Sequence, residues 1–348
     1  SKSHMLIISF IGFQNDTIHV SSKNQQLDIV LRDGVELNEV NIVTRKLGTM
    51  KLRSSVMNED MISSAELSRA ACCNLGESFV TNPSVDVSYS DAATGAKQIK
   101  LLGLSGTYVQ MLTENIPNYR GAASPYGLGY VPGPWMQSIQ VSKGTSSVKN
   151  GYEAITGQIN VEFKKPQLPE ADWVSANLFA STTNRYEANA DATLKISKRW
   201  STSLLAHYEN ETKAHDGNDD GFVDIPQVEQ YNVWNRWAYM GDHYVFQAGI
   251  KALSETRTSG QANHGGAIHS GDLYKVGIDT ERYEFFTKNA YIFNKEKNTN
   301  LALILSTTLH NQDATYGRKL YNVDQTNVYA SLMFETEFNP QNSFSAGL

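Results

Sequence analysis

Apolar and polar residues alternate with a period of two through the second half of the chain. In 186–196 the even positions are apolar or small and the odd positions are polar or charged. The same alternation returns in 200–208, 244–252 and 301–309, and only Leu205 falls out of phase in the first of these. A period of two predicts β-strands with one apolar and one polar face.

The connections between these segments alternate in length. The short ones are 197–199, 241–242, 294–300 and 339–343, and the long ones are 210–230, 255–281 and 311–321. Membrane β-barrels have short turns at one rim and long loops at the other, with apolar side chains toward lipid and polar ones toward the lumen. The pattern therefore predicts an all-β-dominated fold built on a transmembrane antiparallel β-barrel.

Aromatic residues stand beside the short turns and predict an interfacial girdle. They are Trp200, Tyr239, Tyr244, Tyr291 and Phe293. We count about eight strands, with a ninth beginning at Phe344. Because large plugged barrels have about 22 strands, we expect the visible barrel to be incomplete, with an unpaired last strand.

The first half is mixed, which predicts a separate α+β domain. Residues 63–79 carry apolar side chains at helical spacing behind a serine that can cap, so we expect a helix there. The adjacent Cys72 and Cys73 have Cα atoms about 3.8 Å apart, too close for a disulfide. We expect both on this helix and unbridged.

Composition narrows the class further. The 348 residues carry a net charge of -6 and no basic cluster, so a nucleic-acid partner is not expected. No apolar run approaches the roughly 18 residues of a transmembrane helix. No nucleophile elbow or phosphate-binding glycine loop occurs, and an enzyme is not expected.

The stretch 127–166 resembles the last part of the plug domain of TonB-dependent outer-membrane receptors. That plug ends with a hydrophobic strand, a Lys/Arg-Gly turn, then G-x-I-N and K-K-P. Here these features are Ile139 to Val141, Lys143-Gly144, Gly157 with Ile159-Asn160, and Lys164-Lys165-Pro166. The central plug pattern is also similar, although Leu102 stands where an arginine is common and Glu114-Asn115 replaces Asp-Gly.

The resemblance implies four parts. Residues 1–38 resemble the tail of a small β-sandwich, a carboxypeptidase-regulatory-like domain of Bacteroidetes receptors. Residues 39–45 resemble a TonB box and linker, 46–166 a plug domain, and 167–348 the first part of the barrel. The TonB box implies that Val40, Asn41, Ile42, Val43 and Thr44 bind the periplasmic domain of TonB, and an extended segment suits strand addition to a partner's sheet.

The loop 117–135 holds four of the nine prolines and cannot be a regular element. The resemblance implies that such plug loops contact the substrate. The candidate substrate-binding residues are Tyr119, Arg120, Tyr126, Tyr130 and Trp135, of which we expect the first three to be exposed. The alternative is that the aromatic side chains pack the plug against the barrel wall.

One segment, 216–224, fits the pattern D-x-N-x-D-G-x-x-D of a calcium loop. The ligands would be Asp216, Asn218, Asp220, the Phe222 carbonyl and Asp224. Position twelve is Gln227 instead of the usual glutamate, so a solvated acidic loop is the alternative. We expect Ca²⁺ to be the only candidate cofactor.

Two functions are compatible with these patterns. The first is active uptake of a scarce metal chelate, such as a ferric siderophore, haem or cobalamin, through a plugged barrel. The resemblance then implies TonB, the chelate and outer-membrane lipid as partners, and leaves open a surface lipoprotein. The second is a soluble, Ca²⁺-dependent β-rich adhesin or glycan-binding protein, which would not partition into detergent.

Overall fold

The structure is a computed structural model of residues 1–348. It describes residues 4–8, 16–20, 50–51, 58–69, 73–80, 82, 85–145, 153–166, 174–262, 273–339 and 342–348. The chain divides into two units, Ser1–Lys46 and Leu47–Leu348. In the first unit β1 (His4–Ile8) and β2 (Asp16–Val20) pair antiparallel, with Leu6 opposite Ile18. The predicted sandwich tail is represented by this pair alone, because the rest of 1–38 lies outside the described residues.

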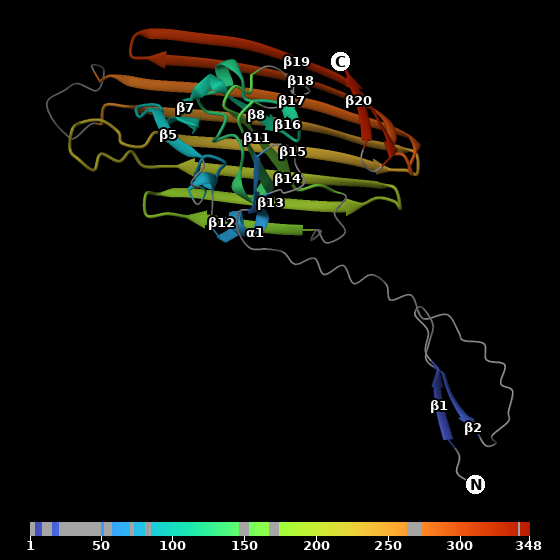
Figure 1. The fold of residues 1–348 in the computed structure, drawn as a ribbon. Helices are drawn as coiled ribbons and strands as arrows, with labels where there is room; N and C mark the ends of the chain where they lie inside the picture. Colours follow the sequence, from blue (N-terminus) through green and yellow to red (C-terminus); the bar gives the residue numbers. More distant parts are fainter. Residues whose placement is uncertain are drawn as a thin grey trace. The chain divides into compact units, whose positions relative to one another are not determined.

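The second unit is dominated by a nine-stranded antiparallel sheet in which each strand pairs with its neighbour in the chain (Figure 1). Its strands are β12 (Val174–Ala180), β13 (Arg185–Lys195), β14 (Trp200–Glu211), β15 (Gln227–Met240), β16 (Tyr244–Gly260), β17 (Lys275–Asn294), β18 (Thr299–Tyr316), β19 (Lys319–Asn339) and β20 (Asn342–Gly347). β12 and β20 are its two edges, so the sheet does not close among the described residues. The predicted eight strands and a ninth are confirmed, with the ninth starting at Asn342.

The two faces of this sheet have the polarity that the alternation predicts. On β15, Asn232 and Arg236 are buried at 0% and 2% exposure, whereas the flanking Tyr231 and Trp237 are 54% and 40% exposed. Polar side chains therefore point inward and apolar ones outward, the reverse of a water-soluble domain. Asn235 falls on the apolar phase, and its Oδ1 accepts a hydrogen bond from Trp237 Nε1 at 2.6 Å.

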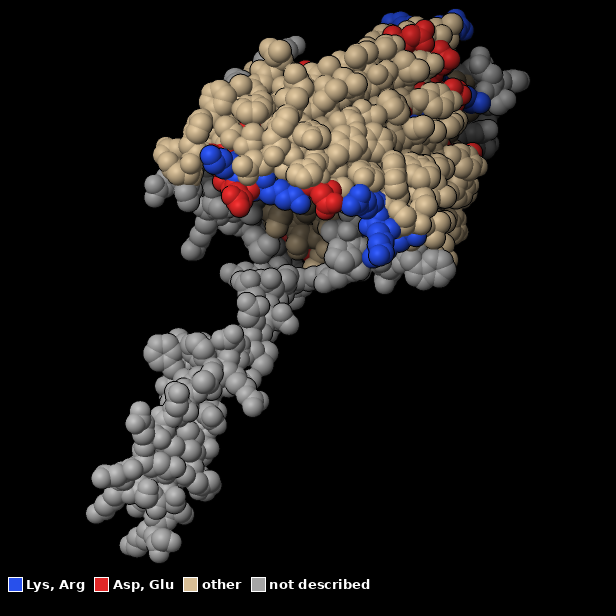
Figure 2. Space-filling view, turned by 90° about the vertical axis from the view of Figure 1, so that its right-hand side faces the viewer, with Lys and Arg blue, Asp and Glu red and all other residues tan. Residues whose placement is uncertain are grey.

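The predicted aromatic girdle is present beside the short turns. The Trp200 ring lies 5.1 Å from Tyr239, and Tyr239 lies 6.0 Å from Tyr244. Tyr291 and Phe293 are 5.0 Å apart and half exposed. On the side drawn in Figure 2, charged side chains lie mainly at the margins of a broad uncharged surface. No helix among the described residues has the length and hydropathy needed to cross a membrane.

The strict alternation of short and long connections is wrong in one place. Residues 311–321 were expected to be a long loop, but β18 runs to Tyr316 and β19 starts at Lys319. Gly317 has φ +61°, which permits a tight turn. In 255–281 the strands also reach further than expected, because β16 runs to Gly260 and β17 starts at Lys275. The polar composition misled because strands that project beyond an apolar belt are polar on both faces.

The second domain of this unit is a plug that the nine-stranded sheet curves around (Figure 1). Its larger sheet has the order β3-β4-β10-β11-β8-β9, and its smaller sheet has the order β5-β6-β7. The strands are β3 (Met50–Lys51), β4 (Asn58–Ser63), β5 (Asp86–Asp91), β6 (Ala96–Leu101), β7 (Leu104–Ser105), β8 (Val109–Thr113), β9 (Ile116–Pro117), β10 (Met136–Lys143) and β11 (Gly157–Phe163). The core of the plug includes Ile139, Val141, Ile159 and Val161, all fully buried. The predicted α+β domain is thus β-rich.

The predicted helix 63–79 is shorter than expected. The α-helix α1 spans Ser64–Arg69, and a 3-10 turn, η1, follows at Glu77–Phe79. Between them Leu75 N donates to Val131 O at 3.0 Å and Gly133 N donates to Cys73 O at 2.8 Å. This pairing with a distant loop overrides the local helical pattern. Cys73 is buried but is not on α1, and Cys72 lies outside the described residues.

Backbone geometry requires a glycine at position 157, which lies in the motif that resembles a plug. Its φ is +154°, and an added Cβ would lie 2.2 Å from the Ser142 carbonyl oxygen on the paired strand. We expect Gly157→Ala to lower the free energy of unfolding by about 1–3 kcal/mol. Urea denaturation followed by tryptophan fluorescence measures this. Gly103→Ala is the control for positive φ alone, since Gly103 has φ +82° and no atom within 4 Å of an added Cβ. Equal effects of the two changes would contradict the clash.

Candidate functional site

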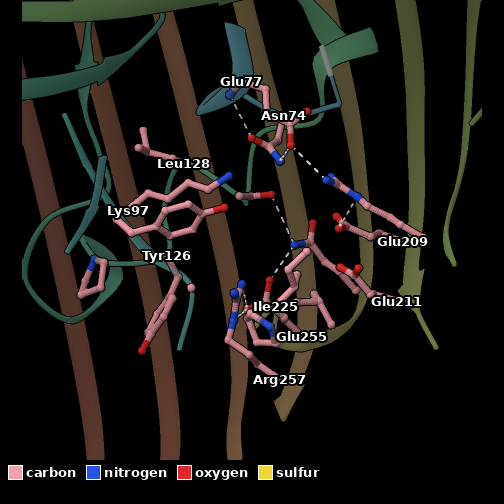
Figure 3. A pocket seen from close by; sticks show the side chains of 18 of the residues that line it. Asn74, Glu77, Lys97, Tyr126, Leu128, Glu209, Glu211, Ile225, Glu255 and Arg257 are labelled. Carbon is pink, nitrogen blue, oxygen red and sulfur yellow. Dashed lines mark hydrogen bonds and ion pairs between the residues drawn. The ribbon is translucent and has the colours of Figure 1, made fainter. Parts of the chain in front are cut away.

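A hollow of about 170 Å³ lies between the plug and the inner face of the sheet (Figure 3). The plug contributes Glu77 from η1, Lys97 from β6, and Tyr126 and Leu128 from the loop before β10. The wall contributes polar side chains from β13 to β16, together with the loop that joins β14 to β15. These wall residues include Arg185, Glu209, Glu211, Ile225, Pro226, Gln230, Glu255 and Arg257. Typical ligand sites reach about 300–1,000 Å³, so the hollow suits one group of a ligand.

Arg185 is the electrostatic centre of one side of the hollow. Its Nη1 lies 2.9 Å from Glu77, its Nη2 2.7 Å from Glu187 and its Nε 3.0 Å from Glu209. Burial on its own raises the pKa of Glu77, but Arg185 outweighs this and the net pKa is lowered. One guanidinium thus joins the plug to two strands of the wall.

Lys97 is the cation of the hollow that is not neutralised in this way. Its side chain is half-buried and extends toward the middle of the hollow (Figure 3). Burial lowers the pKa of Lys97, and Glu77 only partly opposes that effect. Among the ion pairs of the described residues none includes Lys97, and its Nζ lies 5.4 Å from the centroid of the Tyr89 ring. Lys97 can therefore donate hydrogen bonds to an anionic or oxygen-rich group in the hollow.

Arg257 closes the opposite side. Its Nη2 lies 2.9 Å from Glu255, and its Nη1 donates to the Thr94 carbonyl oxygen at 3.1 Å. The guanidinium carbon lies 4.9 Å above the Tyr126 ring. A Cβ at Gly95 would approach Pro226 to 2.7 Å, so the plug hairpin touches the loop that follows β14. The hollow is thus lined by groups held in place from both domains.

The expected exposure of the candidate substrate residues is wrong for the tyrosines. Tyr119 and Tyr126 are 5% and 6% exposed, and Tyr130 and Trp135 are fully buried. The physical reason is that wall side chains cover them: the Tyr119 ring lies 5.3 Å from Arg282 and Trp135 lies 6.3 Å from Trp234. The alternative, that these aromatic side chains pack the plug against the wall, is what the structure has. Arg120 is partly exposed and pairs with Glu153 at 2.8 Å, and of the five only Tyr126 lines the hollow.

The sequence patterns missed the charged lining. Lys97 lies in a short strand, and Arg185, Glu209, Glu255 and Arg257 lie on β13, β14 and β16. The four wall residues occupy the inward phase of their strands. Charged residues at inward positions of the predicted strands were the available signal, but which of them face one hollow depends on strand register.

The acidic loop 216–224 is closed by its own backbone. Asp216 accepts hydrogen bonds from the amides of Asp220 and Gly221, at 3.2 and 2.8 Å, and Asp224 accepts one from Gly217 N at 2.6 Å. Gly221 has φ +85°. Among the described residues no group of three or more His, Cys, Asp or Glu side chains is placed to hold a metal ion. The carboxylates face backbone amides, and calcium binding stays a prediction.

A second contact between plug and wall is deeply buried. Glu114 and Asn115, at φ +52° and +64°, form the turn between β8 and β9. Glu114 Oε1 lies 2.6 Å from Arg236 Nη2, and its Oε2 lies 3.4 Å from Lys288 Nζ. Burial raises the pKa of Glu114, but Arg236 and Lys288 outweigh it, so the net pKa is lowered. This carboxylate stands where the resemblance led us to expect an aspartate.

Comparison with known proteins agrees with this architecture. Residues 51–158 match the family described as the TonB-dependent Receptor Plug Domain. The vitamin B12 transporter BtuB of Vibrio vulnificus is 24% identical over 185 residues, which cover 53% of this chain and 30% of that protein. The alcaligin outer-membrane receptor FauA of Bordetella pertussis has a TM-score of 0.63 at 12% identity over 86% of this chain and 48% of its own. The ferripyoverdine receptor of Pseudomonas aeruginosa gives 0.60 at 13% identity, over 83% and 41%.

These similarities and the plug inside a curved antiparallel sheet define the class. Residues 51–158 belong to the plug family of TonB-dependent receptors, and the second unit has the fold of the outer-membrane receptors named above. The chain spans less than half the length of these relatives. The Bacteroidetes type and the sandwich tail stay predictions, and residues 40–44 lie outside the described residues.

Proposed function

We propose that the protein takes up a scarce metal chelate across the outer membrane, with energy delivered by TonB to the plug. The observation that carries this proposal is the hollow in which plug and wall present charged groups to the same space. A ligand that contacts both domains is coupled to plug movement, because its binding energy depends on where the plug lies. No covalent step is involved, and the relatives are receptors and transporters.

Within this function, Lys97 would hold an oxygen donor of the chelate and Tyr126 would form part of the apolar lining. The proposal leaves the chelate as a class: ferric siderophore, haem, cobalamin or a similar complex. A hydrogen bond to a charged group contributes about 1.5–3 kcal/mol. We therefore expect Lys97→Gln to weaken binding of the chelate by about tenfold to a hundredfold.

The test measures equilibrium binding and cellular uptake of a panel of ferric siderophores, haem and cobalamin. Uptake of the chelate that binds should need TonB and should fall in Lys97→Gln. Lys100→Gln is the matched control, because Lys100 lies on the same strand, β6, and does not line the hollow. Uptake that is equal with and without TonB, or the absence of binding across the panel, would refute the proposed function.

We further propose that Ca²⁺ binds the loop 216–224. Carboxylates about 4 Å apart at an effective dielectric near 20 repel by about 4 kcal/mol, and a divalent ion removes that repulsion. Calorimetric titration with Ca²⁺ should give heat with the wild-type protein and about tenfold weaker binding or none with Asp220→Ala. Asp242→Ala, in a short turn, is the control. Equal heats from wild type and Asp220→Ala, or none from either, leave the solvated-loop alternative.

A further inference from the structure

Four cationic side chains form a continuous group on the inner face of β15, β16 and β17. Arg236, Lys251 and Arg282 are 2%, 2% and 1% exposed, and the Lys288 side chain is 21% exposed. Strand register brings them together. Lys251 lies directly opposite Glu284, which is two residues from Arg282 on β17. Arg236 lies opposite Gly249, which is two residues from Lys251 on β16. We call these four residues the cationic wall.

The plug meets the cationic wall almost entirely with hydrogen-bond acceptors. Arg236 donates to the Lys164 carbonyl oxygen at 2.7 Å, Lys288 to that of Glu114 at 2.6 Å, and Lys251 to that of Tyr130 at 3.1 Å. Asn118 Oδ1 accepts from Arg282. These are neutral oxygen atoms, and among the described plug residues the Glu114 carboxylate is the one charged group that pairs with the cationic wall.

Aromatic faces complete the plug side of this contact. The Tyr119 ring lies 5.7 Å from Lys251 Nζ and 5.3 Å from the guanidinium carbon of Arg282. Its hydroxyl lies 3.2 Å from Lys251 Nζ. Tyr119 has φ +52°, a conformation that costs a bulky residue free energy and is retained where its surroundings hold it. Oxygen atoms and aromatic ring faces of the plug thus occupy the positions on the wall where the acceptor atoms of a ligand would bind.

The charges at this surface do not balance. Among the described residues the four cations have two carboxylates in contact, Glu114 from the plug and Glu284 from β17. Nearby Glu162 is paired with Lys165, and Glu255 is paired with Arg257. When the plug segment 114–119 moves away it removes the Glu114 carboxylate, the Glu114 carbonyl oxygen and Asn118 Oδ1, so the four cations are left with the carboxylate of Glu284. Uncompensated cations at a half-buried surface favour an oxygen anion in place of the lost acceptors.

We propose that the cationic wall is an anion-binding surface that the plug covers at rest and uncovers when it moves. Its ligand is an oxygen anion: a carboxylate, a phosphate, or the negatively charged oxygen donors of a chelate on its way through. The inference rests on the proposed function only in that the plug moves. It adds that the passing cargo presents anionic oxygens to β15–β17, a surface separate from the hollow at Lys97.

The test uses inorganic phosphate as the probe and hydrogen exchange as the readout, on the protein purified in detergent. An anion that binds only the uncovered wall increases the uncovered population by a factor of 1 + [L]/Kd. At 0.1 M phosphate and a Kd of about 10 mM, amide exchange in 109–117 should be about tenfold faster than in chloride of equal ionic strength and pH. Equal exchange in the two salts would overturn the proposal.

Variants assign the effect to the wall. Lys288→Gln, at the most accessible of the four cations, should cut the phosphate-to-chloride ratio at least severalfold, and Arg236→Gln with Lys288→Gln should bring it to one. Glu114→Gln should speed exchange in both salts and keep the ratio, because the wall is intact. Lys275→Gln, exposed on β17, is the control for removing one positive charge.

Several results would contradict the proposal. A ratio that survives the double variant, or that Lys275→Gln lowers equally, assigns the effect to general screening. Exchange of amides in β13 and β14 checks that the variants fold, and Lys288→Gln alone decides if the double variant does not. No transport enters this measurement, so its failure would leave the proposed uptake standing.

Discussion

Replacing Arg236 by alanine is expected to loosen the plug from the sheet more than any other single change on the wall. The guanidinium is 2% exposed and contacts Glu114 at 2.6 Å and the Lys164 carbonyl oxygen at 2.7 Å. It also lies 4.6 Å above the Trp234 ring. Removing one partner of a buried ion pair leaves the other charge unpaired and costs about 3–5 kcal/mol. Lys288 at 3.4 Å from Glu114 compensates only in part.

The measurement is urea denaturation, with the unfolding of the plug followed by hydrogen exchange in 109–117. Arg199→Ala is a matched control, because Arg199 pairs with Asp242 at 2.8 Å but the two side chains are 55% and 70% exposed. Such a surface pair contributes about 0–1 kcal/mol. Equal effects of the two variants would show that the Arg236 pair carries no special stability.

A double-mutant cycle separates the pair from its surroundings. Glu114→Ala alone leaves Arg236 without a carboxylate, and Arg236→Ala alone leaves Glu114 with Lys288. The double variant leaves neither charge of the pair, so it should cost less than the sum of the two single changes by about 1–3 kcal/mol. A sum of the two effects without such coupling would mean that the contacts act independently.

The pair of Arg236 and Glu114 shows which structural features sequence patterns can predict and which they cannot. Arg236 occupies an inward position of a predicted strand, so its direction could be expected from the alternation. Its partner Glu114 lies 122 residues away in the chain, and no local pattern connects the two. The sheet, its outward aromatic residues and the plug were predictable because each depends on short-range periodicity or on a motif. The pairing across the interface depends on how the two domains fit.

In the candidate site, too, contacts between distant parts of the chain could not be predicted from local sequence patterns. The irregular conformation of the loop 117–135 is predictable from its prolines and glycines, and the sequence offers its aromatic side chains either as substrate contacts or as packing against the wall. The burial of Tyr119 and Tyr126 is not predictable in this way, because Lys251, Arg257 and Arg282 cover them from distant strands. Helix 63–79 failed for a similar reason: Leu75 bonds to Val131, and such a contact overrides an apolar spacing that would otherwise favour helix.

Deleting residues 40–44 is expected to abolish uptake and to leave chelate binding intact. The argument is from the sequence, Val-Asn-Ile-Val-Thr, because these residues lie outside the described part of the chain. Alternating β-branched residues favour an extended strand, and an extended segment can add to the edge of a partner's sheet through its backbone hydrogen bonds. The described residues that line the hollow near Lys97 belong to the plug and to the wall.

A single substitution tests the backbone argument more sharply than the deletion. Ile42→Pro removes an N–H donor and opposes strand pairing. An acceptor left unsatisfied costs about 1–3 kcal/mol, so binding of TonB and uptake should fall by about fivefold to a hundredfold. Ile42→Val keeps the donor and the β-branched shape and should retain most of the uptake. Binding of the chelate to purified protein should be the same in wild type and both variants. Unchanged uptake after the deletion would show that TonB engages another segment, and a parallel loss of binding would show that 40–44 supports the fold.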